Sequence, residues 1–135
     1  MSVEVNWYDG EEDILHYRFS DLWLWDEYES AVQSGRTMMR GKPHYVGILN
    51  DMRAVRQPPA MLIAKAKYYI DSRPANTGMA IFVTSSLSMR SLYDILTDVY
   101  PHIGVDYLLD DDFERTVRRI KQWLADNSDT RFETG

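Results

Sequence analysis

Polar side chains follow three apolar runs of the sequence, at residues 50–53, 84–88 and 110–112. If these runs are parallel strands, their carboxyl ends meet at one edge of a sheet, where α/β proteins bind ligands. Hydroxyls and backbone N–H groups at a helix start can hold an anion, and an arginine adds charge. The predicted ligand- or partner-binding residues are Asn50, Asp51, Arg53, Thr84, Ser85, Ser86 and Ser88.

The hydroxyl-rich segment 84–88 also has a purely structural interpretation. Serine is a preferred N-cap, because its side chain accepts a hydrogen bond from the first helical turn. The segment directly precedes a helical pattern. Both interpretations, an anion site and a helix cap, remain open at this point.

A second candidate surface is aromatic and consists of Trp23, Trp25 and Tyr28. Tryptophan and tyrosine are common anchors of protein interfaces, so an exposed cluster would form a partner patch. The alternative is that these rings seal a sheet against the first helix, as large aromatic side chains often do.

No catalytic, metal-binding or cofactor-binding constellation is recognisable, so we expect neither enzymatic activity nor a cofactor. The chain has no cysteine, which excludes thiolate chemistry. It contains no HExxH, Walker or GxGxxG motif, and two of its three histidines have no evident third ligand to complete a zinc site. Residues 9–13 carry four carboxylates but lack the spacing of a calcium loop, which favours a solvated turn.

The elements that position these residues follow from the apolar patterns. Residues 45–52, 79–83 and 105–109 are apolar at nearly every position, which is typical of strands covered on both faces. Residues 3–7 and 14–19 alternate around Asp9-Gly10 and predict a hairpin. The fold class is therefore α/β, with a mixed sheet of about five strands and about four helices.

Helix boundaries are predicted from caps and breakers. The first helix runs from Trp25 until Gly35 can end it, and the second begins at Pro58-Pro59. The third follows the serine-rich segment, and the last begins at Asp111, with Glu114 completing a capping box. Four basic residues of the last helix are expected on a solvated face: Arg115, Arg118, Arg119 and Lys121.

Length and charge restrict the classes of function. The chain has 135 residues with 44% hydrophobic content, enough for one domain, assigned to residues 1–126, followed by a polar tail at 127–135 that is expected to fray. Its net charge of −6 argues against nucleic acid as a partner. No apolar run is long enough for a membrane span, and a cytoplasmic location is expected.

The order of elements resembles the STAS domains of anti-sigma-factor antagonists, and in particular the small SpoIIAA-like domains. The resemblance covers roughly residues 3–125. It is carried by the opening hairpin, the helix start WDEYESA, the strand end ILND and the closing segment VDYLLDDDFERTVRRIKQWL. It rests on order and pattern rather than on an invariant motif.

The resemblance implies a non-enzymatic regulatory or protein-interaction module. Family members are switched by phosphorylation of a serine near the helix after the central strand, but Arg53 stands about where that serine would be. We therefore expect no such switch in the loop that follows Asp51. A protein partner is the expected ligand class. The alternatives are a small anionic, nucleotide or lipid ligand at the carboxyl edge of the sheet, and self-association as a homodimer.

Overall fold

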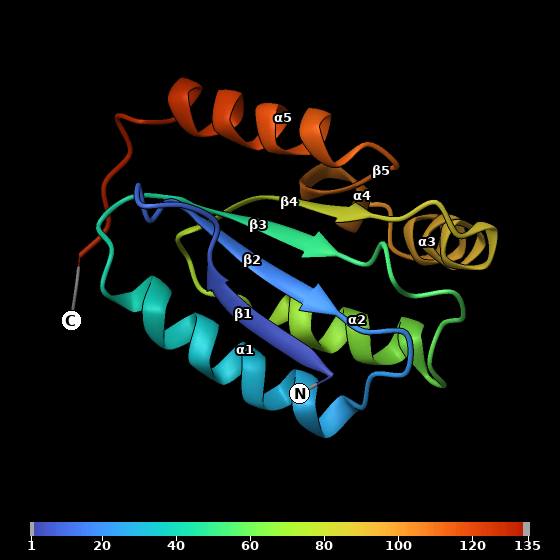
Figure 1. Ribbon diagram of the computed structural model, residues 1–135. Helices are drawn as coiled ribbons and strands as arrows, with labels where there is room; N and C mark the ends of the chain where they lie inside the picture. The colour runs from blue at the N-terminus through green and yellow to red at the C-terminus, as the bar shows by residue number, and fades with distance from the viewer. Residues whose placement is uncertain (1, 134–135) are drawn as a thin grey trace.

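A computed structural model describes residues 2–133 and contains one five-stranded sheet with helices on both faces (Figure 1). The strands are β1 (Val3–Trp7), β2 (Ile14–Phe19), β3 (Val46–Asp51), β4 (Thr77–Val83) and β5 (Tyr107–Asp110). The helices are α1 (Trp25–Arg40), α2 (Leu62–Asp71), α3 (Leu87–Val99), α4 (Ile103–Asp106) and α5 (Phe113–Asp126). The predicted α/β class is confirmed, with one short helix more than expected.

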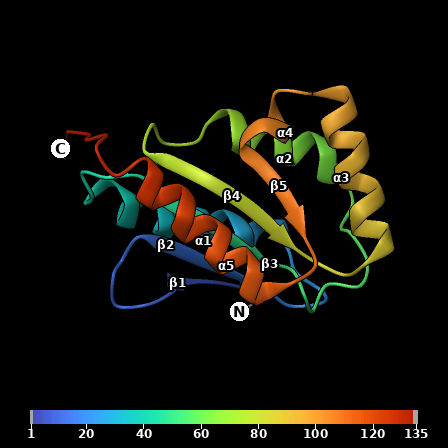
Figure 2. The ribbon, with the colours of Figure 1, turned by 90° about the horizontal axis from the view of Figure 1, so that it is seen from above.

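The strands lie in the order β1-β2-β3-β4-β5, so each neighbour in sequence is also a neighbour in space. β1 pairs antiparallel with β2, and all other pairs are parallel. Right-handed crossovers between successive parallel strands place α1, α2 and α3 on the same face of the sheet. Figures 1 and 2 show α5 alone over the opposite face, above β3 and β4.

Each face of the sheet has its own apolar core, because successive strand residues point in opposite directions. In β3, Ile48 packs among the residues under α1 and α2, whereas Leu49 packs with Ile14, Ile81 and Ile120 under α5. Ile14, Leu49, Ile81 and Ile120 are all fully buried. The core of the α5 face is therefore small but complete.

A glycine permits α5 to approach the sheet closely. A Cβ at Gly47 would overlap the Ile120 side chain, so a larger residue there would push the helix outwards. This contact explains the glycine in the middle of an otherwise bulky strand.

Several predicted helix boundaries are wrong. Gly35 lies inside α1, which continues to Arg40, and α2 begins at Leu62 rather than at Pro58-Pro59. The N-cap of α5 is Asp112, not Asp111, and its side chain accepts from the backbone N–H of Arg115 at 2.9 Å. Residues 103–106 form α4 instead of starting the last strand, so this strand begins only at Tyr107.

The chain after α5 returns towards the start of β3. The Phe132 N–H donates to the carbonyl of Pro43 at 2.7 Å, and the Phe132 ring lies 4.9 Å from that of Tyr45. The tail was expected to fray, but this part of it is anchored, and residues 134–135 lie outside the described residues. None of the helices in the described chain has the length and apolar character needed to cross a membrane.

Candidate functional site

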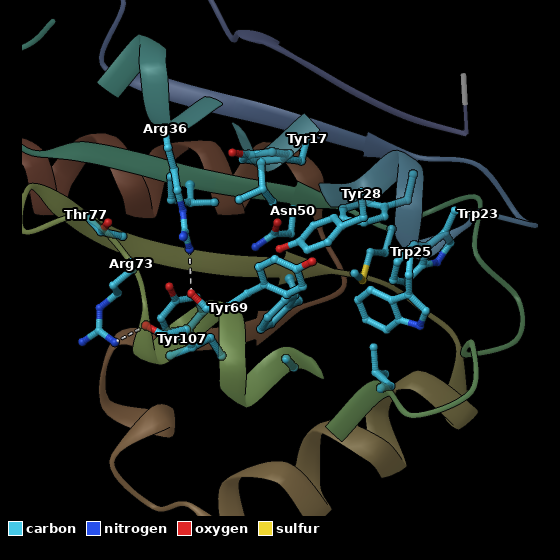
Figure 3. Close-up of a pocket in the computed structure, with 18 of the residues that line it drawn as sticks. Tyr17, Trp23, Trp25, Tyr28, Arg36, Asn50, Tyr69, Arg73, Thr77 and Tyr107 are labelled. Carbon is cyan, nitrogen blue, oxygen red and sulfur yellow. Dashed lines mark hydrogen bonds between the residues drawn. The ribbon is translucent and has the colours of Figure 1, made fainter. Parts of the chain in front are cut away.

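A cavity of about 80 Å³ lies between the sheet and the pair of helices α1 and α2 (Figure 3). On a comparable scale a single water needs roughly 10–15 Å³, so the cavity has room for more than one small group. Eight of its twenty lining residues are aromatic, and most of the others are aliphatic. The aromatic residues that line it are Tyr17, Phe19, Trp23, Trp25, Tyr28, Tyr69, Phe82 and Tyr107.

The strand period explains how these residues meet. Tyr17 and Phe19 in β2, Asn50 in β3 and Phe82 in β4 all point to the face covered by α1 and α2. Tyr17 and Asn50 are opposite each other in the parallel register of β2 and β3. Tyr28 from α1 closes the cavity from the helix side.

Buried polar groups project into this aromatic cavity without partners. The side chains of Asn50, Tyr17 and Tyr107 belong to residues that are 5%, 5% and 7% exposed. None of them forms a hydrogen bond with any other residue in the described range 2–133. Figure 3 shows Asn50 beside the Tyr28 ring, while the Tyr17 hydroxyl points towards the side of Arg36. Their polar atoms keep some accessible surface in the cavity, whereas Trp23 Nε1 is the side-chain polar atom of the described residues that is buried without a partner.

Gly35 provides the room for one of these groups. A Cβ at this position of α1 would overlap the hydroxyl of Tyr17. A glycine inside a helix costs about 1 kcal/mol relative to alanine. Gly35 therefore lowers the stability of α1, but it leaves the space that the Tyr17 hydroxyl occupies at the wall of the cavity.

The tyrosine hydroxyls of the cavity remain protonated at neutral pH. Burial raises the pKa values of Tyr17 and Tyr28, and it raises the pKa of Tyr107 to about 12. Nearby Arg36 opposes the shift in all three, but burial dominates. Each hydroxyl can therefore donate a hydrogen bond to a bound group.

Two arginines also line the cavity. Arg36 of α1 reaches α2 and donates to the Tyr69 carbonyl at 2.7 Å and to Ser72 Oγ at 3.2 Å. Arg73 donates to the Ile70 carbonyl and lies 3.4 Å from Asp106, its acidic partner. No Asp or Glu from the described chain lines the cavity.

Helix α2 is the least anchored wall of the cavity. Ile70, near its carboxyl end, is the one fully buried residue of α2. At the other end Met61 precedes the helix with φ 62° and gives no side-chain cap. A left-handed conformation is unfavourable for such a residue. A second, apolar cavity of about 40 Å³ lies on the other side of α2, against α3, and shares Met52, Leu62 and Phe82 with the first.

The predicted carboxyl-edge site is divided by the sheet. Asn50 faces the aromatic cavity, whereas Asp51 points to the opposite face and binds His16 Nε2 at 2.9 Å. Arg53 completes the Asp51 site through Nε and Nη2, at 2.8 and 2.9 Å, while its guanidinium lies 4.0 Å from the Phe113 ring centroid. The Asp51 carboxylate is therefore fully engaged within the protein.

The electrostatics of Asp51 agree with a structural role. Burial favours the neutral acid, but the hydrogen bonds from Arg53 and His16 outweigh burial and lower the pKa of Asp51 below its usual value. Asp110 at the end of β5 is similar. Hydrogen bonds from Arg115 lower its pKa most, with smaller contributions from the Asp112 N–H and from Arg119.

The hydroxyls after β4 mainly organise the loop and the start of α3. Ser86 is the N-cap and accepts from the Met89 N–H at 3.3 Å, while its hydroxyl donates to the Arg56 carbonyl at 3.0 Å. Thr84 accepts from the Ser86 N–H at 3.1 Å. Ser85 and Ser88 are exposed. The structural interpretation of this segment therefore accounts for both Thr84 and Ser86.

The aromatic residues proposed as a partner patch line the cavity instead of forming an open surface. Trp23 is 6% exposed, and Trp25 and Tyr28 are half-buried. The Trp23 ring packs edge-on against Trp25 at 4.6 Å between centroids, and its Nε1 is buried without a partner among the described residues. Trp25 Nε1 donates to the Ala60 carbonyl and links α1 to the segment before α2.

The acidic hairpin turn is neutralised from a distant part of the sequence. Lys121 Nζ lies 2.8 Å from Asp9, 2.9 Å from Glu11 and 3.4 Å from Asp13. These three carboxylates could otherwise gather around a cation. Of the four basic residues expected on a solvated face of α5, Arg115 and Arg118 are exposed, whereas Arg119 and Lys121 are half-buried. Arg115 and Arg119 also hold Asp110.

Most of the cavity was not predicted from the sequence. Of its polar groups only Asn50 was among the predicted ligand residues, while Tyr17, Arg36 and Tyr107 were not. Two signals were present in the sequence: an asparagine inside an apolar strand, and a glycine within a helical pattern. No protein-family model, curated protein or solved structure matches this chain.

Proposed function

We propose that this chain is a small-molecule-binding domain whose ligand occupies the cavity between the sheet and helices α1 and α2. One observation carries the proposal: Asn50, Tyr17 and Tyr107 are largely buried residues that line an aromatic cavity, where their side-chain polar atoms are accessible and have no partner among the described residues. A ligand would supply the missing hydrogen bonds and cover the aromatic walls. Apolar pockets with a few convergent polar groups are typical of small-molecule sites.

The position of the cavity also supports access by a ligand. It is bounded by α2, which has one fully buried residue and no side-chain cap. Helices with few buried apolar contacts open at low cost in free energy. A ligand can therefore enter by a local displacement of α2 while the sheet and α5 stay in place.

Native mass spectrometry of the protein purified from its own cells tests this proposal. We expect a small-molecule mass on the folded chain that is lost on denaturation. Asn50→Leu should purify folded but without that mass, because the ligand loses an internal hydrogen-bond partner. Asn6→Leu is the matched control, since Asn6 is exposed on β1 and should retain the ligand.

A bare chain would not by itself decide the matter, since a weakly bound ligand is lost during purification. The same preparation is therefore screened by NMR with a fragment library. If the chain is bare and no fragment shifts the amide signals around Asn50, the proposal is overturned.

A protein-interaction module, as the STAS resemblance implies, is the second candidate. It is favoured by exposed apolar side chains at the carboxyl edge of the sheet: Leu22 is 86%, Leu24 62% and Met61 68% exposed. Pull-downs from the native extract with the wild type and with a Leu22→Glu, Leu24→Glu variant test it. A specific partner should be lost with the variant. If the wild type and the variant recover the same partner in equal amounts, Leu22 and Leu24 are not part of the interface.

A further inference from the structure

The cavity differs in charge from the rest of the protein. The chain carries a net charge of −6, yet the cavity is lined by Arg36 and Arg73 and by no carboxylate of the described residues. Arg73 has Asp106 as its acidic partner, whereas Arg36 forms hydrogen bonds only to neutral oxygens, those of Tyr69 and Ser72. The charged side chains that line the cavity are therefore both cationic, while the nearest carboxylates, those of Glu29 on the Tyr69 hydroxyl and of Asp106 on Arg73, lie outside its lining.

The polar groups of the cavity are mostly hydrogen-bond donors. The hydroxyls of Tyr17, Tyr28 and Tyr107 are protonated at neutral pH, as tyrosines ordinarily are, and burial raises their pKa values further. They have no acceptor among residues 2–133. The Arg36 guanidinium has five N–H donors and uses only some of them on Tyr69 and Ser72. Asn50 is the one side chain here with an uncharged carbonyl acceptor. A ligand with acceptor oxygens suits such a set.

The opposite end of the cavity is lined by aromatic rings that pack against one another. Trp25 and Tyr69 are nearly parallel, with an interplanar angle of 10° and 6.3 Å between ring centroids. Tyr28 meets Tyr69 edge-to-face at 4.8 Å, and Trp23 meets Trp25 in the same way at 4.6 Å. Aromatic walls of this kind favour stacked or edge-on contacts with another ring. Figure 3 places Trp23 and Trp25 at one end and Arg36 at the other.

We infer that the ligand of this cavity is a planar aromatic carboxylate, bound with its ring against the surfaces that Trp25 and Tyr28 turn to the cavity and with its carboxylate towards Asn50, Tyr17 and Arg36. This inference rests on the proposed function and specifies the chemistry of the same site. A carboxylate is ionised at neutral pH and accepts several hydrogen bonds. Charge-assisted hydrogen bonds to arginine are stronger than those between neutral groups, so Arg36 selects for the anion.

Three single-ring compounds separate charge from shape: benzoate, benzamide and benzylamine. A fused double ring would be much too large for a cavity of about 80 Å³. Isothermal titration calorimetry at pH 7 should show the carboxylate binding at least tenfold more tightly than the amide. The amine should bind most weakly, because its cation is placed beside Arg36 and the tyrosine hydroxyls.

Substitutions of Arg36 identify the source of this selectivity. Arg36→Met should make the carboxylate and the amide bind equally, and Arg36→Lys should restore part of the difference. Arg40→Met is the matched control, because Arg40 is exposed on the same helix and should leave the preference unchanged. NMR shifts on benzoate binding should include the amides of Asn50 and Tyr17.

The outcomes distinguish the two proposals. If the amide binds as tightly as the carboxylate, or if Arg36→Met leaves the preference intact, the carboxylate assignment is overturned while ligand binding stands. If none of the three compounds binds and the native chain is also bare, both proposals fail together.

Discussion

The two faces of the sheet satisfy their buried groups to different degrees. Under α5 the side chains of Ile14, Leu49, Ile81 and Ile120 are fully buried, and the nearby carboxylates of Asp51 and Asp110 are each held by arginines. Under α1 and α2 a cavity remains, with unpartnered amide and hydroxyl groups on its walls. The comparison separates polar groups that stabilise the fold from polar groups available for binding. Polar side chains are buried on both faces of the sheet, but those under α5 have hydrogen-bond partners and those lining the cavity do not.

The largest expected loss of stability follows from truncating a buried isoleucine, and its size should differ between the two faces of the sheet. Ile120→Ala should lower the free energy of unfolding by about 4 kcal/mol, because the surrounding core is complete and leaves a new void. Ile48→Ala, which enlarges an existing cavity, should cost about 2 kcal/mol, near the lower end of the usual range. Urea denaturation followed by circular dichroism measures both. Equal losses would show that the two faces are packed alike.

Replacing a buried asparagine should have an intermediate effect on stability, and this effect should differ between Asn76 and Asn50. Asn76 is 7% exposed, and its Nδ2 donates to the carbonyls of Met39, Lys42 and His44. Asn76→Leu should cost about 1–3 kcal/mol, because these carbonyls lose their donor. Asn50→Leu should leave the free energy of unfolding unchanged or raise it by up to about 1 kcal/mol, because no internal bond is lost. A loss at Asn50 as large as that at Asn76 would contradict the functional assignment of Asn50.

The smallest expected effect is the change of stability with pH in the acidic range. The pKa values of Asp51 and Asp110 are lowered in the folded state, so their contribution is complete above the unfolded pKa of about 4 and declines as pH falls towards the folded values. Stability should therefore fall by on the order of 1 kcal/mol between pH 5 and pH 3. Urea denaturation at each pH measures this loss. The Asp51→Asn, Asp110→Asn variant should show a flatter profile, and an unchanged slope would argue against the pairing.

Much of the fold could be predicted from local patterns. The apolar runs around β3 and β4 and the alternation of β1 and β2 were sufficient for the mixed sheet, because burial on both faces or on one leaves a direct trace in the sequence. The boundaries were less accurate. Gly35 was interpreted as a helix end, since its actual reason, the hydroxyl of Tyr17 against α1, is a contact between distant residues.

The candidate site was harder to predict for a related physical reason. Asn50 and Asp51 were assigned to one site because they are adjacent, but neighbours in a strand point to opposite faces. Applying the same alternation to β2 would have placed Tyr17 beside Asn50. The ion pairs of Lys121 with the hairpin turn, by contrast, join residues more than a hundred positions apart, and no local pattern indicates them.

The two cavities beside α2 also affect how the protein responds to hydrostatic pressure. Unfolding under pressure is favoured in proportion to the internal void that water fills when the chain opens. The voids here, about 80 and 40 Å³, both border α2, so compression should act first on this helix. A ligand that fills the larger void would reduce the volume change of unfolding as well as adding contacts. Resistance to compression would then measure occupancy of the cavity without any knowledge of the ligand's structure.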